Sequence, residues 1–67
     1  MINRVKELRE QRKLTQQELG NLVNVSRQSI VAIEKGKYSP TIWLAYDLAK
    51  VFGVSIEELF DFERSER

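Results

Sequence analysis

The sequence predicts a compact all-α domain of five helices, and three observations support this prediction. Apolar residues recur every three or four positions along most of the chain, which is the period of a helix with one buried face. Capping residues and glycines interrupt these segments at short intervals, as they do where helices begin and end. No segment alternates apolar and polar residues for long enough to indicate a strand. We expect one domain over residues 1–67, with a core of residues 3–60 and a charged tail of residues 61–67 that frays.

The first helix is predicted from Asn3 to Arg12. Its apolar stripe contains Val5 and Leu8, with Ile2 as an additional member.

The second helix begins at a capping box formed by Thr15 and Glu18, in which the hydroxyl accepts from the amide of residue 18 and the carboxylate reaches back. Gly20 lies mid-helix, where glycine costs about 1 kcal/mol relative to alanine, and the close approach of another helix is a reason to tolerate that cost. The buried face of this helix is predicted to be Leu19, Leu22 and Val23.

The third helix follows a tight turn. Asn24 is the predicted turn residue, because asparagine enters the left-handed region more readily than other non-glycine residues. Ser26 caps the helix, which is expected to end near residue 35 with Gly36 positioned to stop it. Its buried side chains are predicted to be Ile30 and Ile33.

Two further helices complete the predicted fold. The fourth begins around Pro40, which a first helical turn tolerates, with either Ser39 or Thr41 as its cap, and it ends at Gly53. A second capping box, Ser55–Glu58, opens a short fifth helix that runs through residue 60. The core stripe of the fourth helix is predicted to be Leu44 or Ala45, Leu48, Ala49 and Phe52.

The composition excludes several classes of chemistry. The chain has neither cysteine nor histidine, so disulfides, thiol catalysis and the commonest general base and metal ligand are absent. Its carboxylates have no glycine-rich phosphate loop to join them, and Glu57 and Glu58 are adjacent and point to different sides of a helix. We expect no enzyme activity, cofactor, metal or small-molecule ligand. We see neither a membrane-spanning run nor a signal peptide and expect a cytoplasmic protein.

The net charge of +1 is unevenly spread along the chain. Residues 1–37 carry eight basic against four acidic groups, a net charge of +4, and residues 38–67 carry three against six, a net charge of −3. Such a division suggests one surface that faces phosphates and one that faces away, although two ordinary solvated faces would give the same counts.

The segment Thr15–Glu34 combines the second and third helices into a possible DNA-reading unit. The third helix of the chain carries Arg27 and Gln28 in its first turn. These side-chain types make bidentate hydrogen bonds to guanine and adenine in the major groove. The same helix has no acidic residue between Arg27 and Ile33, whereas an ordinary solvated face favours glutamate and lysine.

Several blocks in this order and spacing resemble a known family. They are Leu14–Leu19 (LTQQEL), Val25–Ile30 (VSRQSI), Ile33–Gly36 (IEKG), Pro40 and Leu48–Ser55 (LAKVFGVS). Over about residues 3–60 the chain resembles the Cro and phage-repressor type of helix-turn-helix, also called the xenobiotic-response-element family. The resemblance implies a five-helix DNA-binding domain that acts as a dimeric transcriptional regulator, which we expect to be a repressor. Its second helix would cross the DNA backbone and its third would lie in the major groove.

The resemblance also implies roles for individual residues. Arg27 and Gln28 would read bases, and Gln16 would anchor to a phosphate at the start of the second helix, where free amides favour an anion. Ala32 stands where some relatives have a longer polar reader, and alanine offers only an apolar contact, for example to a thymine methyl group. Ser29 is either a further base contact or a partner of the backbone in the first turn.

Contacts to the DNA backbone and one structural pair complete the predicted site. Thr15 is expected mainly as a cap and secondarily as a phosphate contact. Three residues after the third helix either bind phosphate or form an ordinary exposed loop: Lys35, Lys37 and Tyr38. Arg9 and Glu34 match a pair that ties the first helix to the end of the third, and we interpret this pair as structural.

The aromatic residues exceed what so small a core needs, and one copy of the domain would read little DNA. We therefore predict a homodimer on double-stranded DNA, formed through the acidic C-terminal half, that reads two half-sites about 34–36 Å apart. The candidate interface residues are Trp43, Ile56, Phe60 and Phe62, with Leu59 assigned rather to the core. The other possibility is that some of them complete the monomer core. The competing function is an antitoxin-like or other protein-interaction module with secondary DNA binding.

Overall fold

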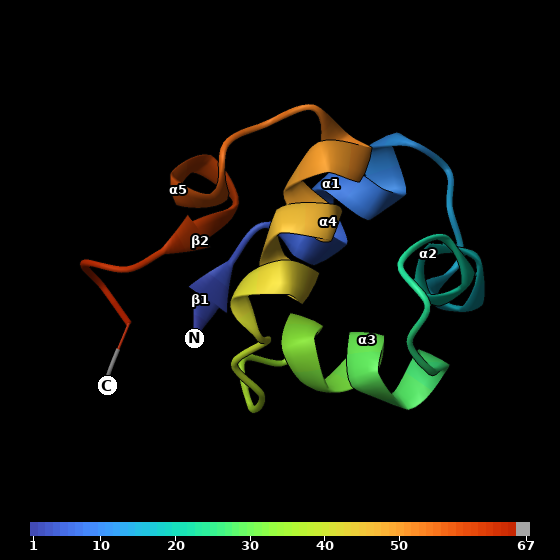
Figure 1. Ribbon diagram of the computed structural model, residues 1–67, viewed down its shortest axis with the longest axis horizontal. Helices are drawn as coiled ribbons and strands as arrows, with labels where there is room; N and C mark the ends of the chain where they lie inside the picture. The colour runs from blue at the N-terminus through green and yellow to red at the C-terminus, as the bar shows by residue number, and fades with distance from the viewer. Residues whose placement is uncertain (66–67) are drawn as a thin grey trace.

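Five short helices and one pair of two-residue strands form the computed structural model, which describes residues 1–65 (Figure 1). The predicted five-helix fold is confirmed. In chain order the elements are β1 (Ile2–Asn3), α1 (Val5–Gln11), α2 (Gln16–Leu22), α3 (Arg27–Glu34), α4 (Ile42–Phe52), α5 (Ile56–Leu59) and β2 (Phe60–Asp61). Their extents are about 28 × 22 × 20 Å, with α2 at one end of the long axis and α5 and β2 at the other (Figure 1).

The helix ends lie close to where the local sequence predicts them. Thr15 forms a complete capping box, with its side chain accepting from Glu18 N at 3.0 Å and its own amide donating to Glu18 Oε1 at 2.8 Å. Ser55 forms the second capping box on α5. Of the two candidates for the cap of α4, Thr41 makes the bond, to the amide of residue 44 at 3.1 Å. Asn24 adopts the left-handed conformation with φ 60°, as predicted for the turn.

The core brings together one face of each helix. Helix α4 contributes the largest share, and all of its predicted core positions are buried, including both Leu44 and Ala45. The buried apolar side chains are Val5, Leu8, Leu19, Val23, Ile30, Ile33, Leu44, Ala45, Leu48, Ala49, Phe52, Leu59 and Phe60. This packing fixes α3 on the body of the molecule through Ile30 and Ile33, both fully buried as predicted.

A short antiparallel pairing joins the two ends of the described chain, and it corrects three predictions. Ile2 pairs with Asp61 and Asn3 with Phe60, so the first helix starts at Val5 rather than at Asn3. Ile2 is 42% exposed and does not belong to the apolar stripe. The expectation of no strand was wrong, because two-residue strands are too short to show alternation.

The predicted charged tail begins later than expected, since Asp61 is part of β2. The amide of Arg64 donates to Asp61 Oδ1 at 3.0 Å, and the Ser65 hydroxyl accepts from the amide of Ile2 at 2.8 Å. Arg64 and Ser65 therefore bond back to the strand pair, and residues 66–67 of the predicted tail lie outside the described residues.

Helix α2 is rotated relative to the prediction, which assigned Leu22 to its buried face. Leu22 is 57% exposed, whereas Leu19 and Val23 are buried and Gly20 is covered by the start of α3. Because the buried face extends toward Gly20, its centre lies on the side of the helix away from Leu22. No helix of residues 1–65 is both long and apolar enough to cross a membrane.

Candidate nucleic-acid interface

Helices α2 and α3 are held at a fixed angle by a close contact at Gly20. A β-carbon added at this position would lie 2.7 Å from the carbonyl oxygen of Val25, so a side chain would force the turn away from α2. The amide of Val25 also donates to the carbonyl of Gly20 at 2.9 Å. The packing reason predicted for the mid-helix glycine is therefore confirmed, and the contact sets how α3 leaves the turn.

The first turn of α3 is organised by Ser26. Its hydroxyl accepts from the amide of Ser29 at 3.2 Å, and the hydroxyl oxygens of the two serines lie 3.3 Å apart. Ser29 is half-buried and bonds to the capping residue. Of the two roles predicted for Ser29, this position agrees with the partner of the backbone in the first turn rather than with the base contact.

One face of α3 is buried and the opposite face is open. Arg27 and Gln28 are exposed in the first turn, and Val31 and Ala32 follow one turn later, both partly exposed. Helical spacing places these four side chains together, away from Ile30 and the core. In Figure 1, α3 lies along the lower edge of the molecule, with its first turn next to α2. The face can therefore approach a flat or convex partner without disturbing the fold.

Arg9, Glu34 and Gln16 form a hydrogen-bonded network behind this face. Arg9 Nε donates to Glu34 Oε2 at 2.6 Å and Nη2 donates to Oε1 at 3.2 Å, in a bidentate pair with side chains only 11% and 4% exposed. Arg9 Nη1 also donates to the carbonyl of Leu14 at 2.8 Å. The hydrogen bonds that Arg9 donates to Glu34 raise the pKa of Arg9. The network ties α1 to the end of α3, as predicted for this pair.

The same carboxylate orients Gln16, the first residue of α2. Gln16 Nε2 donates to Glu34 Oε1 at 3.1 Å. An amide nitrogen has two hydrogens, so one N–H and the carbonyl oxygen of this side chain remain available. The predicted phosphate anchor is thus connected to the end of α3 through Glu34.

The other predicted backbone contacts lie at the ends of these helices. Thr15 accepts from the amide of Glu18, in agreement with its role as a cap, and its side chain is still at the surface. After α3, Lys35 is the C-cap, and Lys37 and Tyr38 are exposed in the connection to α4.

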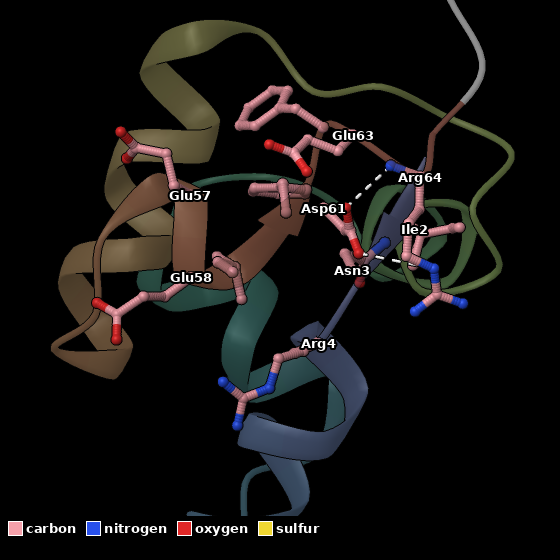
Figure 2. A pocket seen from close by; sticks show the side chains of 11 residues that line it. Ile2, Asn3, Arg4, Glu57, Glu58, Asp61, Glu63 and Arg64 are labelled. Atoms are coloured by element: carbon pink, nitrogen blue, oxygen red, sulfur yellow. Dashed lines mark hydrogen bonds and ion pairs between the residues drawn. The ribbon is translucent and has the colours of Figure 1, made fainter.

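An acidic depression of about 480 Å³ lies at the other end of the molecule, beside α5 and β2. Figure 2 shows Glu57 and Glu58 on one side of it and the Asp61–Arg64 pair, 3.8 Å apart, on the other. Its second arginine, Arg4, pairs with Glu7 of α1 at 2.8 Å. Carboxylates repel phosphates, so this surface is unsuited to a nucleic-acid backbone. Among the described residues, no group of metal-ligating side chains could hold an ion.

An apolar surface beside α4 was only partly identified from the sequence. Ile42 and Trp43 are 74% and 75% exposed, and Tyr46 and Phe62 are about half exposed. Ile42 and Phe62 also line a shallow pocket of about 250 Å³. The sequence did contain a signal that Ile42 is exposed. The first turn of α4 is apolar on more than one face, and only one face of the helix can pack against the core.

Two of the residues predicted for the dimer interface pack instead against the core of the monomer. Phe60 is 1% exposed and belongs to the monomer core, so its assignment to a dimer interface was wrong. The chain leaves α5 one residue before Phe60, and the strand that follows turns this side chain inward. Ile56 is half-buried against the core, and Leu59 is fully buried, as expected.

Comparisons with known proteins agree with this arrangement. The model of the helix-turn-helix family matches residues 5–59. An HTH-type transcriptional regulator of Methanocaldococcus jannaschii is 50% identical over 66 residues, which cover 98% of this chain and 100% of the relative. The P22 c2 repressor, solved in complex with a synthetic operator, superposes with a TM-score of 0.83 and 28% identity over 87% of this chain and 88% of that one. The restriction-modification controller protein C.AhdI from Aeromonas hydrophila superposes with a TM-score of 0.77 and 28% identity, covering 85% of this chain and 86% of its own.

The family match spans most of the chain, and the fold contains the two helices and the tight turn that define the motif. The chain therefore belongs to the Cro and phage-repressor type of helix-turn-helix, the DNA-binding transcriptional regulators.

Proposed function

We propose that this regulator is a sequence-specific repressor that reads operator half-sites in the major groove with α3, as a homodimer. The observation that carries this proposal is the outward face of α3. Arg27 and Gln28 are exposed there, next to each other in the first turn, while the opposite face of the same helix is buried. Arginine discriminates guanine and glutamine discriminates adenine by bidentate hydrogen bonds, each by about 1–3 kcal/mol.

Contacts to phosphates would fix the register of α3 on the duplex without reading sequence. Gln16 is suited to this role because the hydrogen bond to Glu34 holds its amide at the start of α2. Lys35, Lys37 and Tyr38 offer exposed donors beyond the other end of α3, and Thr15 offers its hydroxyl. Anchors on both sides of the base-reading residues would leave α3 little freedom to shift along the groove.

The base-reading part of the proposal is tested by selecting bound sites from a random pool of duplexes and then measuring affinity for all single-base variants. Arg27→Ala should lose about 5- to 150-fold at one position per half-site and become indifferent to the base there. Gln16→Ala should weaken binding to every variant by a similar factor, because a phosphate contact carries no sequence information. An equal loss across the panel for Arg27→Ala would refute the assignment of this residue as a base reader.

A homodimer is supported by the apolar surface around α4. Ile42 and Trp43 are three-quarters exposed and lie in the acidic C-terminal half of the sequence, outside α2 and α3. Large exposed apolar side chains in a group are typical of protein interfaces. Two copies joined there would present two α3 helices to half-sites about 34–36 Å apart. Phe62 would border the same surface.

The dimer is tested by sedimentation of the intact protein at micromolar concentration, with and without the selected duplex. Trp43→Ser should produce a monomer with an unchanged helical spectrum, because the side chain is outside the core. A protein that is already monomeric in both conditions would refute the homodimer. A monomer that binds another protein through this surface, and DNA only weakly, would favour the alternative of an antitoxin-like interaction module.

A further inference from the structure

The end of α3 is bound from outside the helix by the segment that contains β1. Asn3 Nδ2 donates to the carbonyl of Ile33 at 2.9 Å, and the nitrogen of Met1 donates to the carbonyl of Gly36 at 2.7 Å. The two backbones come close, because a β-carbon at Gly36 would lie 3.1 Å from the carbonyl oxygen of Met1. In Figure 1, β1 lies near the end of α3 that is farther from α2. The turn after α3 is therefore fixed to β1, which is itself paired with β2.

The hydrogen bond from Asn3 is not needed to cap α3. The helix closes on itself, since the amide of Gly36 donates to the carbonyl of Ile33 at 2.9 Å. The amide of Lys37 donates to the carbonyl of Ala32 at 3.0 Å. Together with the left-handed conformation of Gly36, at φ 74°, these bonds form a Schellman motif. A carbonyl oxygen has two lone pairs, so Asn3 binds the second one of Ile33 and thereby fixes where the turn lies.

Asparagine is an uncommon residue in a strand, so its side chain needs a reason at this position. Besides the bond to Ile33, Nδ2 donates to the carbonyl of Met1 at 3.1 Å and Oδ1 accepts from the amide of Val5 at 3.0 Å. A serine or threonine hydroxyl accepts from an amide two residues ahead in the same way. The donation to Ile33 is the contact that specifically requires the longer amide side chain.

The turn that Asn3 holds carries two of the proposed phosphate contacts. Lys35 and Lys37 lie directly before and after Gly36, and both are exposed. Lysine is a point charge on a flexible stem, so it meets a phosphate in register only where its backbone is held. We propose that Asn3 is a positioning residue for DNA binding, which fixes the turn through Ile33 so that both lysines meet the DNA backbone. This inference rests on the proposed function, because it requires α3 to lie in the major groove.

The salt dependence of DNA binding is the readout, because it counts contacts to phosphate. The logarithm of the affinity falls with the logarithm of the salt concentration, by about 0.9 for each phosphate that the protein neutralises. When the slope is shallower by about 0.9, a fourfold rise in salt weakens binding about 3.5-fold less than in the wild type. A variant that is merely less stable has less active protein at every salt concentration, and its slope is unchanged.

The experiment measures the affinity of the full chain for the selected duplex at several salt concentrations. Asn3→Ser keeps a hydroxyl for the amide of Val5 and is too short to reach Ile33. It removes no charge, yet it should make the slope shallower by about 0.9 for each copy of the chain bound. The variant with both Lys35→Ala and Lys37→Ala should lose about 1.8 per copy. Adding Asn3→Ser to that variant should change the slope no further, because the side chain acts through the lysines.

Ser55→Ala is the matched control, because it removes the cap of α5, outside α3 and the turn, without changing any charge. Its slope should equal that of the wild type. Asn3→Thr is a second variant that favours the strand and should reproduce the slope of Asn3→Ser. Both variants of Asn3 should keep the base preference of Arg27, which lies at the other end of α3. Circular dichroism confirms that each variant is folded at the temperature of the titration.

The outcomes separate the two proposals. If the double lysine variant has a shallower slope while both variants of Asn3 keep the wild-type slope, the positioning role is refuted and the proposed function stands. If Ser55→Ala makes the slope as shallow as Asn3→Ser does, the effect follows stability rather than the turn, and the positioning role is again refuted. If the double lysine variant keeps the wild-type slope, the proposed phosphate contacts of the two lysines fail and this inference fails with them.

Discussion

Loss of either partner of the Arg9–Glu34 pair is predicted to remove much of the stability of this protein. The two side chains are joined by two hydrogen bonds, of 2.6 and 3.2 Å, and are 11% and 4% exposed. Gln16 and the carbonyl of Leu14 depend on the same groups. Removing one partner leaves an uncompensated charge in a place that water reaches poorly.

The size of the effect follows from burial. Breaking a buried ion pair by removing one partner costs about 3–5 kcal/mol. A domain of 67 residues has a total free energy of unfolding of roughly 3–10 kcal/mol, at 0.05–0.15 kcal/mol per residue. Glu34→Leu or Arg9→Met alone should therefore lower the melting temperature by at least about 12 °C, at 4 °C or more per kcal/mol.

The assay is unfolding followed by circular dichroism, by heat for the melting temperature and by urea for the free energy of unfolding. Tryptophan fluorescence is a poor probe here, because Trp43 is 75% exposed in the folded protein. The variant with both Arg9→Met and Glu34→Leu should recover most of the loss, since an apolar pair of similar volume leaves no charge unpaired. Arg4→Ala is the matched control, because its pair with Glu7 is about half exposed and water screens it, so its loss should change stability little. A loss for Glu34→Leu no larger than that control would refute the reasoning.

Three further changes test the local structure. Arg12 donates to the last two carbonyls of α4 at 3.1 and 2.6 Å, so Arg12→Ala should lower the free energy of unfolding by about 1–2 kcal/mol in urea, and an unchanged midpoint would contradict this cap. Asn24 has φ 60°, so Asn24→Ala should lower the free energy of unfolding by about 1–2 kcal/mol, while Asn24→Gly should not lower it. Equal urea midpoints for the two variants would contradict a turn that strains alanine. Hydrogen bonds from Thr15, the backbone amide first, hold the pKa of Glu18 below its usual range. The resulting stabilisation is complete above the unfolded-state pKa of about 4.3 and is lost as pH falls through the lower folded value. Melting curves of wild type and Glu18→Gln should therefore converge in acid, and a gap that is constant with pH would contradict this linkage.

Helix boundaries were predictable because the signals that set them are local. The hydroxyls of Thr15, Ser26 and Ser55 bond to amides three residues away, and Gly53 and Asn24 take conformations that few other residues favour. The order of these signals along the chain is enough to divide it into helices. The pairing of β1 with β2 has no such signal, because it depends on residues about sixty positions apart meeting at the surface.

The rotation of the helices was harder to predict. Helix α2 has seven residues, so Leu22 fits an apolar stripe with Leu19 as well as Val23 does. Only the position of α3 over Gly20 decides between them. Whether an aromatic side chain is buried depends in the same way on packing. Phe60 lies in the core, whereas Phe62, two residues later, is half exposed.

Some contacts of the candidate site could also be predicted from the sequence, and others depend on how the helices pack. The pair of Arg9 with Glu34 follows from the family resemblance, and its geometry agrees. The hydrogen bond from Gln16 to Glu34 could not be predicted, because it joins the first turn of one helix to the last turn of another. Likewise, the exposed position of Ile42 becomes clear only when the face of α4 toward the core is known.

Chemical-shift mapping by NMR tests the central claim most directly, because it reports on the backbone amides one by one. The intact protein, labelled with 15N, is titrated with a duplex selected from a random pool. The account predicts that the largest changes lie at the start of α2, along α3 and at Lys37 and Tyr38, with the acidic depression of α5 and β2 nearly unaffected by the DNA itself. Largest changes at Glu57–Arg64, with α3 unperturbed, would contradict the assignment of α3 as the DNA-reading helix.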